Sequence, residues 1–332
     1  MTIWENLSNQ RIFHIDIRNI IGKNVAVVYR YKKMNSIPTD LKSKALETPN
    51  LAAGVVCADQ ISILSAVKEG VNVNLIDPIL IGNKSLIKDN SNEVGLNIEN
   101  FEIINTKDDQ EAASVACSLA NDNKIKIIIK GNLHTDVLMK SYLKKEHNLI
   151  EGKRLSHIWH MTAPKLNKPL YITDGALNVL PRVDIKLQIL KNAVEFYKKL
   201  QSSKPKVALL SGTEDPIESM PSSIDSKKVM DLANKENIDA LVFGPLAFDN
   251  AVSSEAAKIK GITNEVAGNA DIILVPNLET GNSLSKIMVY YMDACAAGIV
   301  IGGKTPVVVP SRADNKVSKL ASIMAAVVAS QK

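Results

Sequence analysis

The chain has 332 residues, which is enough for roughly two domains with well-filled cores. Its apolar content of 45% and charged content of 23% are ordinary for a globular protein, so disorder is not the expected state. The net charge of +5 comes from scattered lysines without a basic arm, and aromatic residues make up only 4%, so nucleic acid is not an expected partner.

The stretch up to Asn50 carries the weakest pattern. Residues 24–31 (NVAVVYRY) predict a strand. The polar stretch that follows is broken by Pro38 and Pro49, and it predicts a loop or docking segment.

From Leu51 onward, predicted strands and helices alternate, which is typical of an α/β protein. LAAGVVCA and VNVNLIDPILIG predict strands, and between them ISILSAVKEG predicts a helix that stops at Gly70. After a helical stretch at DQEAASVACSLANDN, the apolar run from Ile125 to Ile129 predicts a strand of a parallel sheet covered on both faces. A further helix is expected from Thr135 to Lys145.

A second unit is expected to begin near Ser156. LSHIWHM, PLYITDGALN, KPKVALLSG and IDALVFGPL predict strands, and VDIKLQILKNAVEFYKKLQ predicts an amphipathic helix. Helices are expected at 226–235 and 253–260, and a long one after Ser283, interrupted near Ala297. The last helix is expected to bury one face. If the strand 306–309 joins the first sheet, the first domain is discontinuous in sequence.

The stretch 271–282 (DIILVPNLETGN) predicts a strand, a loop and a helix that restarts at Gly281. This order leaves backbone N–H groups free near Gly281, Asn282 and Ser283, where the helix dipole favours an anion such as phosphate. Further along, the strand 307–309 is followed by Ser311 and Arg312, a hydroxyl and a guanidinium suited to phosphate oxygens. We expect the two strand ends to converge on one phosphoryl group.

Two motifs are rejected by their context. Residues 298–305 (GIVIGGKT) satisfy the Walker A pattern, but Pro306 and a β-branched run follow, so the required helix is missing. The turn at Gly302 and Gly303 can lie near a ligand or be a plain turn. His157 and His160 lie three apart on a predicted strand and therefore face opposite sides, so they do not form one metal site.

Several predicted strand ends carry small and polar residues. TDGALN (173–178) ends in Asn178, and its alternative interpretation is a turn capped by Asp174. VFGPLAFDNA (242–251) is similar, and from its spacing alone a plain turn is the preferred interpretation. Taken together, such strand ends are where open α/β sheets bind ligands. No GxGxxG fingerprint follows any strand, which weakens a nicotinamide-binding interpretation.

The expected location is the cytoplasm. Cys57, Cys117 and Cys295 lie far apart, without the spacing of a disulfide framework or a zinc site. The amino terminus does not resemble a secretory signal, and no apolar run reaches the length needed to span a bilayer.

The chain resembles the phosphate acetyltransferase and butyryltransferase family, and most of all its butyryl branch. KGNLHTDVLMKSYL, LSHIWHM, YITDGALN, KPKVALLS, FGPLAFDNA, EVAGNADIILVPNLETGNSLSK and VVVPSRAD occur in the order seen in that family. Most specific are PNLETGN, which is similar to PDLNTGN of the acetyl branch, and the SR pair after a strand. The resemblance covers roughly Leu51 to Ser330.

The resemblance implies an α/β fold with two domains of the isocitrate or isopropylmalate dehydrogenase-like kind. Mostly parallel sheets would be flanked by helices, with an active-site cleft between the domains. Domain I would comprise residues 1–155 and 299–332, and domain II residues 156–298. A homodimer or larger homo-oligomer is also implied.

The implied activity is the reversible transfer of a short acyl group between CoA and phosphate in a ternary complex. Acyl-CoA, phosphate and acyl phosphate would be the partners, with CoA as a substrate and neither a cofactor nor a metal required. A free thiol has a pKa of about 8.5, so a carboxylate base would help. Asp314 is the candidate base, and the N-cap of the last helix is its equally weighted alternative.

The remaining site residues follow from the same resemblance. Ser311 and Arg312 would complete the catalytic set with Asp314. Binding of phosphate or acyl phosphate is expected at Thr280, Gly281, Asn282 and Asn178, and binding of CoA at Lys140, Thr135 and Gly302. The acetyl branch has an aspartate at the position of Ser318. Lys140 replaces an arginine of the relatives, which keeps the charge and loses the bidentate fork.

Two other functions stay open. One is a dehydrogenase of the related isocitrate or hydroxythreonine-phosphate kind, which needs a metal or nicotinamide site. The other is a non-catalytic module that binds acyl-CoA or acyl phosphate, an interpretation that the loss of an arginine at Lys140 leaves open.

Overall fold

The computed structural model describes residues 12–16, 26–30, 36–311 and 314–331. The chain forms two units, residues 1–36 and residues 37–332. The first unit contains an antiparallel pair, β1 (Ile12–Asp16) and β2 (Ala26–Arg30), in which Ile12 pairs with Arg30. The strand predicted at 24–31 is therefore confirmed in its centre.

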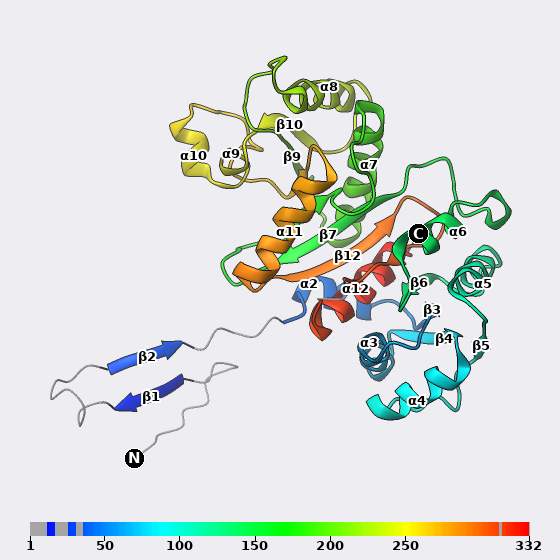
Figure 1. The fold of residues 1–332 in the computed structure, drawn as a ribbon. Helices are drawn as coiled ribbons and strands as arrows, with labels where there is room; N and C mark the ends of the chain where they lie inside the picture. Colours follow the sequence, from blue (N-terminus) through cyan, green and yellow to red (C-terminus); the bar gives the residue numbers. More distant parts are fainter. Residues whose placement is uncertain (1–11, 17–25, 31–35, 312–313, 332) are drawn as a thin grey trace. The chain divides into compact units, whose positions relative to one another are not determined.

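The second unit is built on one eleven-stranded sheet, with the order β10-β9-β11-β8-β7-β12-β13-β6-β3-β4-β5 (Figure 1). The strands are β3 (Leu51–Val56), β4 (Ile76–Gly82), β5 (Ile103–Asn105), β6 (Ile127–Lys130), β7 (Ser156–Thr162), β8 (Leu170–Thr173), β9 (Lys206–Leu210), β10 (Leu241–Leu246), β11 (Ile272–Leu274), β12 (Cys295–Ile301) and β13 (Val307–Val308).

Helices cover this sheet. They are α2 (Thr39–Leu46), α3 (Ile61–Asn72), α4 (Lys84–Val94), α5 (Asp109–Asn121), α6 (Thr135–Tyr142), the 3-10 turn η1 (Lys145–His147), α7 (Val183–Leu200), α8 (Pro221–Lys235), α9 (Phe248–Val252), α10 (Ser254–Ile259), α11 (Leu278–Met292) and α12 (Lys316–Ala329). The predicted α/β class, with a mostly parallel sheet flanked by helices, is confirmed.

Strand direction reverses three times in the middle of the sheet. β10, β9, β11 and β8 are mutually parallel, and so are β13, β6, β3, β4 and β5. Between these groups, β8 pairs antiparallel with β7, β7 with β12, and β12 with β13. The two parallel groups therefore point in opposite directions, and β7 and β12 join them.

The central strand β12 corrects the sequence interpretation. A long helix was expected after Ser283, with an interruption near Ala297, but α11 ends at Met292, and residues 295–301 form a strand. All seven residues of β12 are buried. A strand covered on both faces shows no alternation of apolar and polar residues, so periodicity alone cannot distinguish it from a buried helix.

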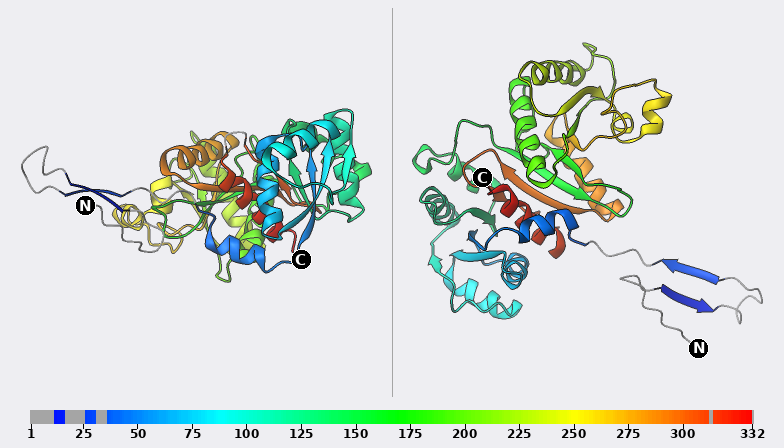
Figure 2. Two further views of the ribbon diagram at one scale, coloured as in Figure 1. Left: turned by 90° about the horizontal axis from the view of Figure 1, so that it is seen from below. Right: turned by 180° about the vertical axis from the view of Figure 1, so that it is seen from behind.

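Two other expectations near the start of the second unit are corrected. The stretch after residue 31 was expected to be a loop or docking segment, and the loop alternative is wrong, because the stretch contains the helix α2, which lies alongside α12 (Figures 1 and 2). Its residue Asp40 accepts a hydrogen bond from His160 on β7 at 3.1 Å, which ties the helix to the sheet. Helix α3 does not stop at Gly70, because this glycine is buried within the helix, which continues to Asn72.

The core differs between the two faces of the sheet. On one face, a single cluster runs through α3, α12, α7 and α8. On the other face the buried residues form two clusters, one beneath α5 and α6, the other beneath α9 and α11. Helix α12 is buried all round from Ser318 to Val328, not on one face as expected, because sheet and helices surround it.

The chain returns to the first strands near its end. Val307 and Val308 of β13 pair with Ile128 and Ile129 of β6, as expected if the last strand joins the first sheet. Within the described residues, no helix combines the length and the apolar character needed to cross a membrane.

Candidate active site

The carboxyl ends of three adjacent parallel strands bring together part of the predicted site. β13 pairs with β6 and β6 with β3, all in the same direction, so the loops that follow them leave one edge of the sheet. These loops carry residues 57–60, 131–134 and 309–315, and we refer to them as the β3–β6–β13 edge. Ser311 and Asp314 lie in the third loop, and Thr135 begins α6 directly after the second. Arg312 lies outside the described residues.

Asp314 closes the loop on which Ser311 lies. The backbone N–H of Ser311 donates to the Asp314 carboxylate at 2.8 Å, and the N–H of Asp314 donates to the Ser311 carbonyl at 3.1 Å. Asn315, not Asp314, is the N-cap of α12, because its side chain accepts from the Ser318 N–H at 2.9 Å. The N-cap alternative for Asp314 is therefore wrong, and its role as a base stays a prediction.

Two lysines act on this carboxylate. Burial raises the pKa of Asp314 above its ordinary value, while the Ser311 N–H and the charges of Lys319 and Lys286 act in the opposite direction. Lys286 belongs to the middle of α11, so a charge from that helix acts on the carboxylate in the loop. Lys319 lies in α12, and its ammonium donates to the Asp314 carbonyl at 2.6 Å.

Thr135 and Lys140 lie on the exposed surface of α6. Thr135 is the first residue of the helix, beside the β3–β6–β13 edge. Lys140 lies further along and pairs with Asp136 at 3.3 Å, in an i,i+4 arrangement in which both side chains are largely exposed. The hydrogen bond from Lys140 lowers the pKa of Asp136. These two of the three candidate CoA ligands are thus open to solvent on a helix that starts at this edge.

The same edge holds a buried polar group that the sequence interpretation missed. Lys130, at the end of β6, is only 9% exposed, and its ammonium lies 3.3 Å from the Gly131 carbonyl. Cys57 follows β3, and its thiol donates to an Asp109 carboxylate oxygen at 3.5 Å. Burial and the charge of Asp109 raise the pKa of Cys57, so this thiol is not an activated nucleophile. Asp59, two residues later, has one buried carboxylate oxygen without a partner among the described residues.

The remaining predicted residues lie at the opposite edge. Asp174 follows β8, and its carboxylate accepts from the backbone of His157, Ala176 and Leu177 and from the Asn178 side chain, at 2.7–3.0 Å. The Asn178 amide also donates to the Leu155 carbonyl and accepts from Arg154 at 2.8 Å. The amide of Asn178 is therefore occupied by the protein itself and shapes this loop.

The amino-terminal end of α11 packs against that loop. The helix begins at Leu278, capped by Asn277, rather than restarting at Gly281. The N–H of Gly281 donates to the Asn277 carbonyl, and Asn282 lies one turn inside the helix, so the expected free N–H groups there are absent. A methyl group on Gly281 would lie 2.7 Å from the Cα of Gly175, so the contact requires glycine. Thr280 donates its hydroxyl to Asn277 at 2.7 Å.

The glycine turn after β12 also has a packing role. A methyl group on Gly302 would lie 2.3 Å from the Arg154 carbonyl oxygen, and one on Gly303 would lie 2.3 Å from the Tyr142 hydroxyl. Lys304 donates to the Asn121 carbonyl at 3.1 Å, and strand β13 follows. The rejection of a Walker A loop is confirmed, because no helix begins after the lysine.

The expected convergence of the two strand ends is wrong. β11 and β13 run in opposite directions because three antiparallel pairings separate them, so their carboxyl ends lie at opposite edges. Ser311, Asp314 and Thr135 belong to one edge, whereas Asn178, Thr280, Gly281, Asn282 and Gly302 belong to the other. From α11, it is Lys286 that acts on Asp314.

The two histidines of β7 are buried in different surroundings, which agrees with the prediction that they do not share a site. His157 packs edge-on against Trp159, and burial lowers its pKa to about 3. His160 packs against Tyr171 and contacts Asp40. Within the described ranges, no group of three or more histidine, cysteine, aspartate or glutamate residues could hold a metal ion.

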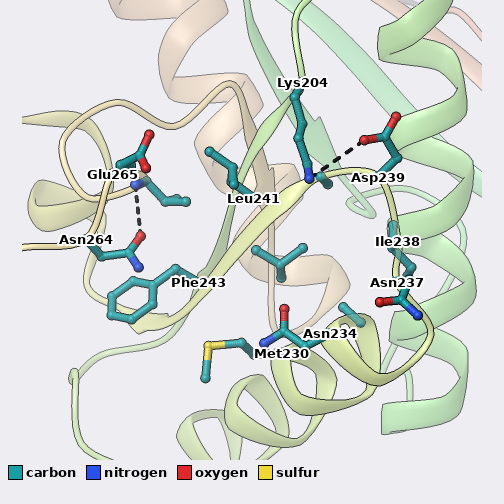
Figure 3. A pocket seen from close by; sticks show the side chains of 14 residues that line it. Lys204, Met230, Asn234, Asn237, Ile238, Asp239, Leu241, Phe243, Asn264 and Glu265 are labelled. Atoms are coloured by element: carbon teal, nitrogen blue, oxygen red, sulfur yellow. Dashed lines mark hydrogen bonds and ion pairs between the residues drawn. The ribbon is translucent and has the colours of Figure 1, made fainter.

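A cavity of about 770 Å³ lies at the outer strand β10 (Figure 3). It is lined by Leu241 and Phe243 of the strand and by Met230 of α8, with asparagine side chains around them. It contains none of the predicted site residues.

Comparison with known proteins gives one consistent result. The family model described as phosphate acetyl/butaryl transferase matches residues 110–327. The chain is 36% identical over 303 residues to the phosphate butyryltransferase of Clostridium acetobutylicum, which covers 91% of this chain and 99% of that one. It is 39% identical over 258 residues to the phosphate acetyltransferase of Rickettsia felis, which covers 77% and 74%.

A solved structure agrees with the sequence matches. The crystal structure of a branched-chain phosphotransacylase from Enterococcus faecalis V583 aligns with a TM-score of 0.75 and 32% identity. The alignment covers 84% of this chain and 99% of that one.

Proposed function

Since the chain belongs to the phosphate acetyltransferase and butyryltransferase family, we propose that it transfers a short acyl group reversibly between CoA and phosphate at the β3–β6–β13 edge. The observation that carries this location is the Ser311–Asp314 loop, which closes on a half-buried carboxylate on which the charges of two lysines act. Arg312 lies within this loop by sequence, and its guanidinium would add two donors for phosphate oxygens.

The chemistry requires one proton to move. In the direction of acyl-CoA synthesis, the CoA sulfur attacks the carbonyl carbon of the acyl phosphate, and the bond from that carbon to the phosphate oxygen breaks. Asp314 accepts the thiol proton, and Arg312 and Ser311 hold the departing phosphate. In the reverse direction, a phosphate oxygen attacks the thioester and Asp314 returns the proton to sulfur. No covalent enzyme intermediate is needed.

Thr135 and Lys140 would bind CoA, because α6 begins at the same edge and both side chains are exposed. For Gly302, Asn178, Thr280, Gly281 and Asn282, the predicted ligand contacts stay predictions. Their observed contacts hold the opposite edge together, which favours a role in positioning α11 and its Lys286.

The division into two domains, residues 1–155 with 299–332 and residues 156–298, belongs to the same proposal. The split of the core on one face of the sheet supports it, because α5 and α6 cover one cluster and α9 and α11 the other. A cleft of the isocitrate dehydrogenase-like kind would then lie over β7 and β12. A cytoplasmic location, a homodimer or larger homo-oligomer, and independence from metals and other cofactors complete the proposal.

The experiment follows free thiol while the purified protein is mixed with acetyl-CoA, propionyl-CoA or butyryl-CoA and phosphate. We expect thiol release that depends on phosphate. Asp314→Asn should reduce it by about 10²-fold or more, as for the loss of a general base. Asp122→Asn is the matched control, because Asp122 is about half exposed at the end of α5 and should leave the rate unchanged.

The same preparation separates the rival functions. Binding of acyl-CoA without thiol release from any of the three substrates would select the binding module. Reduction of a nicotinamide nucleotide with a hydroxy acid and a divalent metal would select the dehydrogenase.

A further inference from the structure

Lys319 is a buried lysine in the first turns of α12. Its side chain is 4% exposed, although lysine is seldom withdrawn from water without a partner for its charge. An uncharged residue of similar length would fill the same space without the cost of desolvation. A buried lysine at this position therefore indicates that its positive charge has a role.

The ammonium of Lys319 is only partly satisfied by the protein. It carries three N–H donors, and one of them meets the Asp314 carbonyl at 2.6 Å. Within the described part of the chain, no carboxylate lies within ion-pair distance of this nitrogen, and two donors are left without an acceptor. Burial lowers the pKa of Lys319, while the charge of Asp314 raises it. The protein thus offers the Lys319 ammonium a neutral backbone carbonyl oxygen, whereas an anion would balance its charge.

The surroundings add positive charge. Lys319 reaches back to the amino-terminal end of α12, where the helix dipole disfavours a cation. Lys286 acts on the same loop from α11, and the Ser311 N–H points into it. Against these stands the single carboxylate of Asp314, whose pKa burial raises. The local balance is therefore suited to a group with more than one negative charge.

We infer that Lys319 binds a phosphoryl oxygen of phosphate or acyl phosphate, holding the Asp314 loop with one ammonium proton and offering the other two to the ligand. The inference rests on the proposed function and adds a catalytic residue to it. A lysine suits this place because an ammonium is a compact charge that can serve loop and ligand together. The interaction strengthens as the phosphate departs with its charge.

A purely structural clamp is the alternative, and the two differ in what replacement by methionine does. If Lys319 only holds the loop, Lys319→Met lowers the melting temperature and leaves the Michaelis constant for phosphate unchanged. If Lys319 also binds phosphate, methionine weakens phosphate binding and raises the Michaelis constant for phosphate, whatever the change in melting temperature.

The experiment measures steady-state thiol release by Lys319→Met, with phosphate and acyl-CoA varied separately. We expect the KM for phosphate to rise about tenfold or more, as for the loss of a charged hydrogen bond, and the KM for acyl-CoA to change less than about threefold. Lys319→Arg, which retains the charge, should recover part of the loss. Lys316→Met is the matched control, because Lys316 is exposed at the start of the same helix and should change neither constant.

An unchanged KM for phosphate in a folded Lys319→Met protein overturns the inference, as does an equal effect in Lys316→Met. If Lys319→Met does not fold, Lys319→Gln is compared in the same way. The outcome is separable from that for the proposed function. If the unaltered protein releases no thiol, the function fails, whereas turnover that is indifferent to Lys319 removes only this inference.

Discussion

Replacing Asp174 by asparagine should destabilise the second unit strongly, although the two side chains have almost the same shape. The Asp174 carboxylate is 2% exposed and accepts four hydrogen bonds, two on each oxygen. Asparagine keeps one oxygen and turns the other into an NH2 group, so two of the four donors would face a donor. The loop that carries Asn178, and through it Arg154, would lose its anchor.

The size of the effect follows from these contacts. A buried donor left without an acceptor costs about 1–3 kcal/mol, so two of them should lower the free energy of unfolding by about 2–6 kcal/mol. Urea unfolding followed by circular dichroism measures this, provided that the slope with urea is unchanged. Asp184→Asn is the control, because Asp184 is 64% exposed and should shift the free energy by less than about 0.5 kcal/mol. An Asp174→Asn protein as stable as this control would refute the reasoning.

Three further predictions address the site and its supports. Burial raises the pKa of Asp314 above 3.8, and a general base works only when it is ionised. The acid limb of the pH–rate profile should therefore lie above pH 3.8 and vanish in Asp314→Asn. An acid limb at or below pH 3.8 counts against Asp314 as the base. In Gly175→Ala the new methyl group would lie 2.6 Å from the backbone of α11, so thermal unfolding should show a loss of stability of about 1–3 kcal/mol. Gly212→Ala is the control, because its methyl group would meet only a flexible methionine side chain at 3.1 Å, and its stability should change little. Burial opposes ionisation of Asp40, but the hydrogen bond from His160 lowers the pKa of this carboxyl below 3.8. Asp40→Asn should therefore lower the free energy of unfolding by about 1–3 kcal/mol at pH 7, and by less as the pH falls through the lowered pKa. An equal loss of unfolding free energy at all pH values would exclude the Asp40–His160 pair as the cause.

The sequence predicted the elements with distinct patterns. The amphipathic helix α7 and the apolar strand β6 lie close to their expected places. The sequence permitted the return of β13 to the first strands without proving it, because the residues of a strand do not reveal its partners. The start of α11 was missed, although Asn277 followed by an acidic first turn is a recognisable N-cap signal.

The site could be predicted only in part, because residues far apart in sequence meet through strand order and direction. Nothing in the local sequence around β12 reveals that it pairs antiparallel with both neighbours, yet this pairing places Ser311 and Gly281 at opposite edges. Lys319 was missed because its neighbours in α12 suggested one buried face, whereas the helix is buried all round. Its burial is a tertiary property, which a single sequence does not carry.

A crystal structure of the protein with phosphate bound tests the central claim most directly. The account predicts phosphate density at the β3–β6–β13 edge, within hydrogen-bond distance of Ser311 and the Lys319 ammonium. Density confined to the corner formed by Gly281 and Asn282, with the Ser311 loop free of ligand, would contradict it.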